Sequence, residues 1–217
     1  ACYQPGRGGV LYCDSHFQLF PHVGFAEVLY SHGVVDMIEV RGLTKRFGAQ
    51  TVLDSLDFTI KSGESVAVIG RSGAGKSVLV KHLVALMKPD EGEVQLDGQN
   101  LVSLSERQLL SIRSRFGMLF QGAALFDSLT VAENIAFALD KGSANSESVS
   151  ERISEVLGLV ELPGIEDKHP AELSGGMQKR VGLARAIVHR PGIILYDEPT
   201  TGLDPISSDV IDQLMMR

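Results

Sequence analysis

The chain has 217 residues, 44% of them hydrophobic, and a formal net charge of −7 at pH 7. This length suffices for one large domain or two small ones with a buried core. The acidic balance argues against a dedicated nucleic-acid surface, and no apolar run is long enough to cross a bilayer. The cysteines, Cys2 and Cys13, form neither a disulfide framework nor a metal-ligand spacing.

Both ends differ in texture from the middle of the chain. Residues 1–36 contain no lysine, but they hold both cysteines and three of the four tyrosines. They lack the basic start and clean apolar core of a signal peptide. We interpret them as a non-native or disordered extension, followed by a domain over residues 37–217. The last segment, residues 209–217, stops inside a predicted helix, so we expect a domain truncated at its C-terminus.

The first half of the domain predicts strands followed by a strand–loop–helix unit. Residues 37–47 and 51–60 alternate like strands of a half-exposed sheet. Residues 65–70 (SVAVIG) are a β-branched run suited to a buried parallel strand. A glycine-rich loop and a helix over 75–87 follow. We then expect a strand at 91–98, a helix at 105–115 and a short strand at 116–120.

The second half predicts mostly helix. Residues 130–160 are typical of helices, with a polar surface loop at 141–148. A glycine-rich start opens a helix over 174–190, and 191–200 predicts a buried strand that ends in acids. This order indicates an α/β fold with a parallel core sheet, an N-terminal antiparallel β portion and a helical subdomain inserted over about 122–172.

The loop after the SVAVIG strand fits the phosphate-binding pattern G-x-x-x-x-G-K-[ST]. Its glycines let backbone N–H groups wrap around phosphate oxygens, and the following helix adds a positive N-terminus. The lysine can reach the β- and γ-phosphates, and the serine hydroxyl can ligate Mg²⁺. A plain glycine turn would not need the strand before it and the helix after it. The predicted nucleotide-binding residues are Gly70, Arg71, Ser72, Gly73, Ala74, Gly75, Lys76, Ser77 and Val78.

A second candidate site is the acidic pair Asp197 and Glu198. Four apolar residues (IILY) deliver these acids to a strand end, where ligands bind in open α/β sheets. Asp197 can hold Mg²⁺, and Glu198 can orient an attacking water or accept its proton. A solvated acidic turn is the alternative. Together with the phosphate loop, the pair predicts Mg²⁺-dependent phosphoryl transfer by a P-loop NTPase.

Four motifs in this order resemble the ABC transporter ATPases over residues 38–217. Leu173–Met177 (LSGGM) precedes the acidic strand, and TGLD (201–204) follows it. The family's signature is LSGGQ, so a methionine stands where glutamine is usual. The resemblance implies a head-to-tail dimer in which Ser174, Gly175 and Gly176 contact the γ-phosphate of ATP held by the partner subunit. By itself, such a helix start would be an ordinary N-cap.

Other positions take roles only through this resemblance. Gln121 resembles the glutamine that senses Mg²⁺ and the attacking water, so we count it with Glu198 and Lys76 as catalytic. Phe47 matches the aromatic that stacks on adenine, although a core phenylalanine is the alternative. Asp204 resembles the aspartate that crosses the dimer interface, and it can also cap the helix that starts at Pro205. His82 and His189 are assigned no role.

One branch of the family is the most similar. GRSGAGKSVLVKH, FGMLFQGAALFDSLTVAENIAF, LSGGMQKRVGLARAI and ILYDEPTTGLDPI resemble the ATPase of bacterial Mce-type phospholipid transporters, which include the maintenance-of-lipid-asymmetry system. The resemblance implies a peripheral ATPase on the cytoplasmic face of the inner membrane, with transmembrane permease subunits and a periplasmic Mce lipid-binding protein. Its substrate would be phospholipid moved between the inner and outer membranes.

Three alternatives stay open. The chain could serve an importer of amino acids or methionine, or an exporter of lipoproteins. It could be a soluble ABC protein that acts on ribosomes or DNA, which the acidic charge does not favour. It could also be an inactive fragment, since the family's switch histidine follows a further strand beyond Arg217. Without that strand, which lies inside related sheets, we expect residues 1–217 to bind nucleotide poorly and to hydrolyse little.

Overall fold

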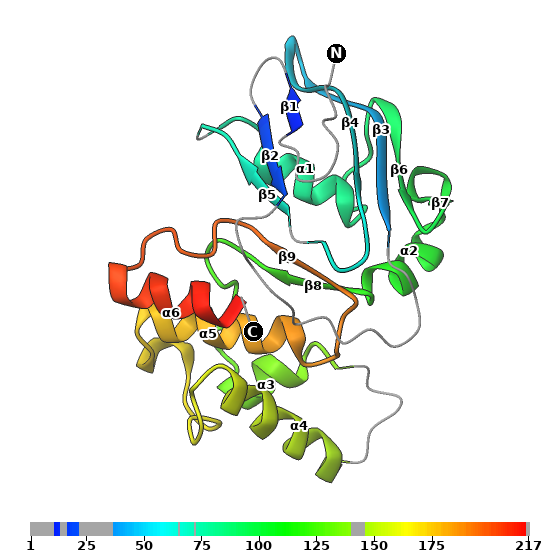
Figure 1. The fold of residues 1–217 in the computed structure, drawn as a ribbon. Helices are drawn as coiled ribbons and strands as arrows, with labels where there is room; N and C mark the ends of the chain where they lie inside the picture. Colours follow the sequence, from blue (N-terminus) through cyan, green and yellow to red (C-terminus); the bar gives the residue numbers. More distant parts are fainter. Residues whose placement is uncertain are drawn as a thin grey trace. The chain divides into compact units, whose positions relative to one another are not determined.

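The computed structural model describes residues 11–13, 17–21, 37–64, 66–71, 73–139 and 146–215. The chain divides into two compact units, residues 1–113 and 114–217, whose helices and strands are labelled in Figure 1. No helix in the described ranges has both the length and the hydropathy needed to cross a membrane.

The first unit contains a four-stranded antiparallel sheet in the order β4-β3-β6-β7. The central strand β3 pairs with β4 on one side and β6 on the other, and the predicted alternation is confirmed because Ile38 and Val40 are buried on either side of Glu39. The strands are β3 (Ile38–Phe47), β4 (Gln50–Ile60), β6 (Glu91–Leu96) and β7 (Gln99–Asn100).

Two helical elements contact this sheet, the helix after the glycine loop at β4 and a short 3-10 helix at β6. The predicted helix after the glycine loop is confirmed but ends early, because Ala85 takes a left-handed φ of 52°. The helical elements are α1 (Lys76–Leu83), η1 (Leu101–Ser103) and α2 (Glu106–Arg113). His82 lies on the buried side of α1 at 1% exposure, so it is a core residue.

Strand β5 (Val66–Ile69) departs from the sequence prediction. It pairs antiparallel with β2 (Phe17–Pro21), which pairs with β1 (Leu11–Cys13), whereas the sequence predicted a parallel strand. Its Ala67 is exposed, so the strand is not buried throughout. The backbone groups of a strand need partners, and the partner that the described residues supply runs in the opposite direction. Apart from β1 and β2, residues 1–36 lie outside the described residues, and their interpretation as an extension stays a prediction.

The second unit contains the predicted parallel pair and the predicted helices (Figure 1). β8 (Phe116–Leu119) and β9 (Ile193–Tyr196) run parallel in register. β9 is half-buried rather than buried, since β8 is its only hydrogen-bonded neighbour among the described strands. The helices are α3 (Val131–Ala136), α4 (Ser146–Leu159), η2 (Pro170–Glu172), α5 (Gly175–Ile187) and α6 (Pro205–Met215). Residues 141–145 of the predicted polar loop lie outside the described ranges.

Helix α5 is the centre of the second unit. It contacts β8, α3, α4 and α6, and Val181 and Ala184 in its middle are fully buried. Two glycines permit its close approach to β8. A Cβ at Gly117 would overlap the carbonyl oxygen of Ala186, and one at Gly182 would lie 2.9 Å from Cδ1 of Leu119. Side chains at these positions would therefore push the helix off the sheet.

The loop between β8 and α3 is organised by one buried amide. Asn134 is fully buried, and its Oδ1 accepts a 2.8 Å hydrogen bond from the N–H of Phe126. Its Nδ2 donates to the carbonyl oxygens of Phe126, Leu129 and Thr130 at 2.9–3.1 Å. Both N–H groups of this amide and one acceptor site of its oxygen are thus used by the 126–130 loop.

We predict that Asn134→Ala lowers the free energy of unfolding by about 2–4 kcal/mol, because buried backbone groups lose their partners. The exposed amide of Gln213 bonds only Asp209 within the same helix, so Gln213→Ala should change it by less than about 0.5 kcal/mol. Urea denaturation measures both. Equal effects would show that the Asn134 hydrogen bonds do not stabilise the loop.

Candidate functional site

The phosphate loop has the backbone shape that the glycine pattern predicts. Gly73 and Gly75 have φ values of 79° and 97°, and Gly75 is the N-cap of α1. A Cβ on Gly75 would lie 2.6 Å from Cγ1 of Val52 on β4, whereas a Cβ on Gly73 would meet nothing within 4 Å. Gly75 is therefore required by packing against β4, in addition to the approach of a phosphate that the sequence pattern predicts.

Lys76, at the end of the loop, forms hydrogen bonds to residues at its start. Its ammonium donates to the carbonyl oxygen of Gly70 at 2.9 Å and to that of Arg71 at 3.2 Å. The N–H of Ala74 also donates to the Arg71 carbonyl, at 3.0 Å. The loop thus curls around the first turn of α1, with the lysine charge held at the helix N-terminus, and this arrangement suits a phosphate.

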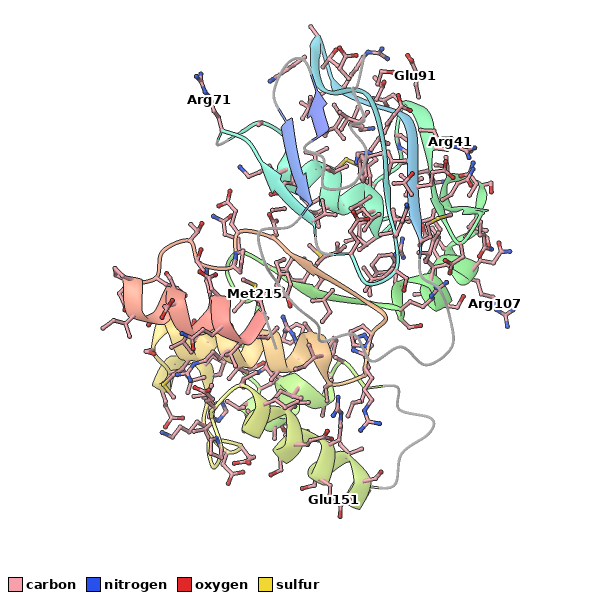
Figure 2. The ribbon with its side chains drawn as sticks, viewed as in Figure 1. Arg41, Arg71, Glu91, Arg107, Glu151 and Met215 are labelled. Atoms are coloured by element: carbon pink, nitrogen blue, oxygen red, sulfur yellow. The ribbon has the colours of Figure 1, made fainter. Side chains whose placement is uncertain are left out.

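The remaining loop residues differ in exposure. Arg71 is exposed, and its side chain points away from the ribbon (Figure 2). Ser77 and Val78 are half-buried in the first turn of α1. Ser72 lies outside the described residues. The role of each in nucleotide binding stays a prediction.

Phe47 is not a core residue. It ends β3 with 48% of its surface exposed, and the ammonium of Lys45 lies 5.8 Å from its ring centroid. The exposure excludes the core alternative and leaves a ring face available for stacking, which stays a prediction for adenine. Lys45 is itself held by Asp90 at 2.9 Å. The pKa of Asp90 is lowered, first by the N–H of Arg46 and then by Lys45.

The ends of β8 and β9 bring two predicted catalytic side chains together. Asp197 extends the strand pairing, since its N–H donates to the carbonyl oxygen of Leu119 at 2.9 Å. Just beyond, Nε2 of Gln121 donates to Oε2 of Glu198 at 3.1 Å, and the Thr201 hydroxyl donates to the same oxygen at 3.2 Å. Glu198 has a left-handed φ of 50°, a conformation that costs energy in a non-glycine residue and occurs often at functional sites.

The metal prediction rests on single side chains rather than on a preformed cage. Within the described ranges, no three His, Cys, Asp or Glu side chains cluster in a way that would hold a metal ion. Mg²⁺ in nucleotide sites is usually bound by one or two protein groups together with phosphate oxygens. Ser77, at the start of α1, and Gln121 and Asp197, at the ends of β8 and β9, have oxygen atoms of that kind.

The start of α5 is joined to the start of α6. Ser174 is exposed and caps α5 by accepting from the N–H of Met177 at 3.3 Å. A Cβ on Gly176 would lie 2.9 Å from the Oγ of Ser207. Ser207 in turn donates to Asp204 at 2.7 Å. The glycine pair is thus partly a packing requirement between two helices, with Gly175 exposed at the tip.

Asp204 is a helix cap in this structure. Its Oδ1 accepts from the N–H groups of Ile206 and Ser207 at 3.1 and 3.0 Å. The hydroxyl and then the N–H of Ser207 lower the pKa of the Asp204 carboxyl. The capping alternative is confirmed, and the role across a dimer interface stays a prediction.

Two cations on α5, buried Lys179 and half-buried Arg185, were missed by sequence reasoning. Lys179 is 6% exposed and bonds the 198–201 loop. Arg185 donates to the carbonyl oxygens of Ala123 and Ala124 at 2.7 Å each. The available signal was a charge on an otherwise apolar helix face. Burial lowers the pKa of both side chains, and it raises that of nearby Tyr196 to about 12.

Comparisons with known proteins agree with this geometry. A model of the ABC transporter family matches residues 53–201. The chain is 46% identical over 180 residues to the Mycobacterium tuberculosis protein named "Probable ribonucleotide transport ATP-binding protein mkl", covering 82% of this chain and 50% of that protein. It is 45% identical to the Arabidopsis thaliana chloroplast protein TRIGALACTOSYLDIACYLGLYCEROL 3, covering 82% and 54%.

A third relative is the methionine import ATP-binding protein MetN of Legionella pneumophila (strain Lens), with 44% identity, 83% of this chain and 53% of that protein. Among solved structures, the ATP-binding cassette MJ0796, in a dimeric post-hydrolysis state bound to ADP and Pi, has a TM-score of 0.73 and 34% identity, covering 82% and 81%. The chain spans about half the length of the curated relatives it matches.

The two loop glycines predict different costs on substitution. Gly73→Ala should lower the free energy of unfolding by about 1–2 kcal/mol, the cost of a left-handed φ. Gly75→Ala should cost about 1–3 kcal/mol more, because its Cβ also collides with Val52. Denaturant unfolding of both variants measures the difference. Equal losses of unfolding free energy in the two variants would show that Val52 on β4 moves aside without cost, so that packing does not constrain Gly75.

Proposed function

Since the chain belongs to the ABC transporter family, we propose that it is the ATP-binding and ATP-hydrolysing subunit of a transporter that moves phospholipid between bacterial inner and outer membranes. The observation that carries the enzymatic part is the Glu198 carboxylate at the end of β9, held by Gln121 and Thr201 through the same oxygen. These two contacts hold the carboxylate in one orientation at the strand end, and a carboxylate held in this way can orient an attacking water.

In the proposed chemistry, one set of residues binds the nucleotide and another acts on the attacking water. Lys76 and the N–H groups of the 70–78 loop bind the β- and γ-phosphates, and Phe47 stacks on the adenine. Lys76 exchanges its two carbonyl partners, on Gly70 and Arg71, for phosphate oxygens, which form stronger charge-assisted hydrogen bonds. Glu198 orients the attacking water and accepts its proton.

Mg²⁺, when bound with ATP, neutralises charge on the β- and γ-phosphates. Ser77, Gln121 and Asp197 are the side chains that would hold it. Gln121 then has two tasks, since its amide nitrogen donates to Glu198 while its amide oxygen is the atom suited to a cation.

We propose a head-to-tail dimer in which Ser174, Gly175, Gly176 and Asp204 face the partner's nucleotide. Exposure of Ser174, Gly175 and Asp204 supports this role, and so does the dimeric form of the similar cassette MJ0796. The N–H groups at the start of α5 and the helix dipole favour an anion there.

An exposed aromatic pair supports a membrane-embedded partner. Phe126 and Phe137 are 43% and 61% exposed, and their rings lie 4.8 Å apart. Such a pair in the loop-and-helix region after β8 is suited to burial in a protein interface. We propose a transmembrane permease as the partner, with the chain peripheral on the cytoplasmic face of the inner membrane and a periplasmic Mce protein in the same complex.

The names of the relatives point to different transported substrates. One relative is named for a galactolipid, which favours lipid transport. Another is a methionine importer of nearly equal identity, so methionine import is the second candidate. ATP hydrolysis by the purified complex, stimulated by phospholipid or by methionine in the absence of the other, separates the two.

For the enzymatic proposal, we predict that Glu198→Gln in the full chain keeps ATP binding within about threefold and lowers kcat at least about 100-fold, because the proton acceptor is lost. Glu151→Gln is the control, since Glu151 is exposed on α4 (Figure 2). Fluorescent-nucleotide titration and phosphate release are the measurements. Near-normal turnover in Glu198→Gln would remove Glu198 from this role. Lys76→Ala, in contrast, should weaken binding itself.

For the partner proposal, Phe137→Asp should reduce recovery of the permease when the tagged ATPase is purified from detergent-solubilised membranes. A charge at this position would be buried without a partner in the interface. Leu159→Asp is the control, because Leu159 is also exposed (49%) but ends α4. Recovery of the permease with Phe137→Asp at the level of the control would place the interface elsewhere.

A further inference from the structure

Lys179 makes an unusual set of contacts for a surface-type residue. Its side chain is 6% exposed, and its ammonium donates to the carbonyl oxygens of Pro199 and Thr201 at 2.7 Å each and of Glu198 at 3.4 Å. All three acceptors are backbone groups of the loop that follows β9. These contacts of Lys179 therefore fix the backbone conformation of the loop and do not involve its side chains.

The chemistry of the ammonium suits this arrangement. A protonated lysine carries three N–H donors on a tetrahedral nitrogen, and three carbonyl oxygens converge on it. A neutral amine would have one donor fewer and could not bond all three carbonyl oxygens. Burial opposes the charge and lowers the pKa of Lys179, while the negative charge of Glu198 acts in the opposite direction.

The loop that Lys179 contacts, residues 198–201, contains a strained residue that needs stabilising contacts. Glu198 has a φ of 50°, a conformation that persists only where surrounding contacts enforce it. The Glu198 carbonyl also accepts from the N–H of Thr201 at 3.2 Å, and the Thr201 hydroxyl bonds the Glu198 carboxylate. Fixing the peptide planes at 198, 199 and 201 thus fixes the direction in which the Glu198 side chain leaves the backbone.

The partner of Glu198 is anchored to the same helix. Arg185, six residues further along α5, binds the carbonyl oxygens of Ala123 and Ala124, which follow Gln121. Both of these alanines have left-handed φ values, 58° and 49°. The 3.1 Å contact between Gln121 and Glu198 therefore joins two strained loops that are each held by a cation on α5, buried Lys179 for one and half-buried Arg185 for the other.

We propose that Lys179 is a positioning residue for Glu198, acting through the backbone of residues 198–201. The inference rests on the proposed function for its kinetic consequence, but the structural part stands without it. A misdirected Glu198 carboxylate would slow the chemical step, since misplacement by about 1 Å can cost roughly 100-fold in rate. Nucleotide binding would be weakened less, because the three partners of the Lys179 ammonium all lie in the loop that carries Glu198.

The test compares Lys179→Met, Lys179→Arg and a control, Lys168→Met, in the full chain. Lys168 is exposed in the same unit. Hydrogen–deuterium exchange is measured without nucleotide on the peptide covering residues 197–204, and kcat and KM for ATP are measured alongside. We expect Lys179→Met to speed exchange in this peptide at least about tenfold, to lower kcat at least about tenfold and to change KM less than about threefold.

Rescue by the conservative variant separates positioning from general stability. Lys179→Arg keeps a cation with several donors, so exchange and kcat should return toward wild type, while Lys168→Met should match wild type in both. Should Lys179→Met not fold, Lys179→Gln supplies the same comparison. Unchanged exchange or unchanged kcat would overturn the inference, as would faster exchange over the whole second unit without rescue by arginine.

The two proposals fail in different ways. A wild-type chain that binds and hydrolyses no ATP would overturn the proposed function, and the exchange data would still decide whether Lys179 holds the loop. Normal hydrolysis by the wild type together with normal kcat in Lys179→Met would overturn the positioning role alone.

Discussion

The second unit depends on how closely α5 approaches β8. Glycine stands at both contact points, because Gly117 faces the carbonyl of Ala186 and Gly182 faces Leu119. Close packing of this kind leaves no room for a side chain on either surface. It also places Lys179 and Arg185 of α5 within hydrogen-bonding distance of the two loops that follow β9 and β8.

Both loops carry strained residues, and both are held through main-chain carbonyls. Ala123, Ala124 and Glu198 have positive φ values, a conformation that is costly for L-residues. Lys179 and Arg185 offset part of that cost by donating hydrogen bonds to main-chain carbonyl oxygens of these loops. Because these contacts are to the backbone, the cations hold the loops without using the side chains of Gln121 and Glu198, for which we propose chemical roles.

Local signals in the sequence were reliable where the physical cause is local. The capping box at Thr130 and Glu133, the Ser174 cap and the Asp204 cap all lie where the sequence places helix starts, because a cap needs only its own next three residues. The alternation of β3 and the parallel β8–β9 pair followed from residue periodicity and order. Prediction was weaker for β5 and β9, whose burial and partners are supplied by distant segments.

By itself, the sequence determined the phosphate-loop pattern and the residue types at the ends of β8 and β9, because these follow from spacing along the chain. It also indicated the family, through the resemblance of four motifs in the family's order. Tertiary structure alone decided that Phe47 is exposed, that Gly75 must lack a side chain because of Val52, and that Lys179 serves the loop carrying Glu198. These features depend on contacts between residues that are many positions apart. Spacing cannot specify such contacts, since they arise only when packed elements bring the atoms within bonding distance.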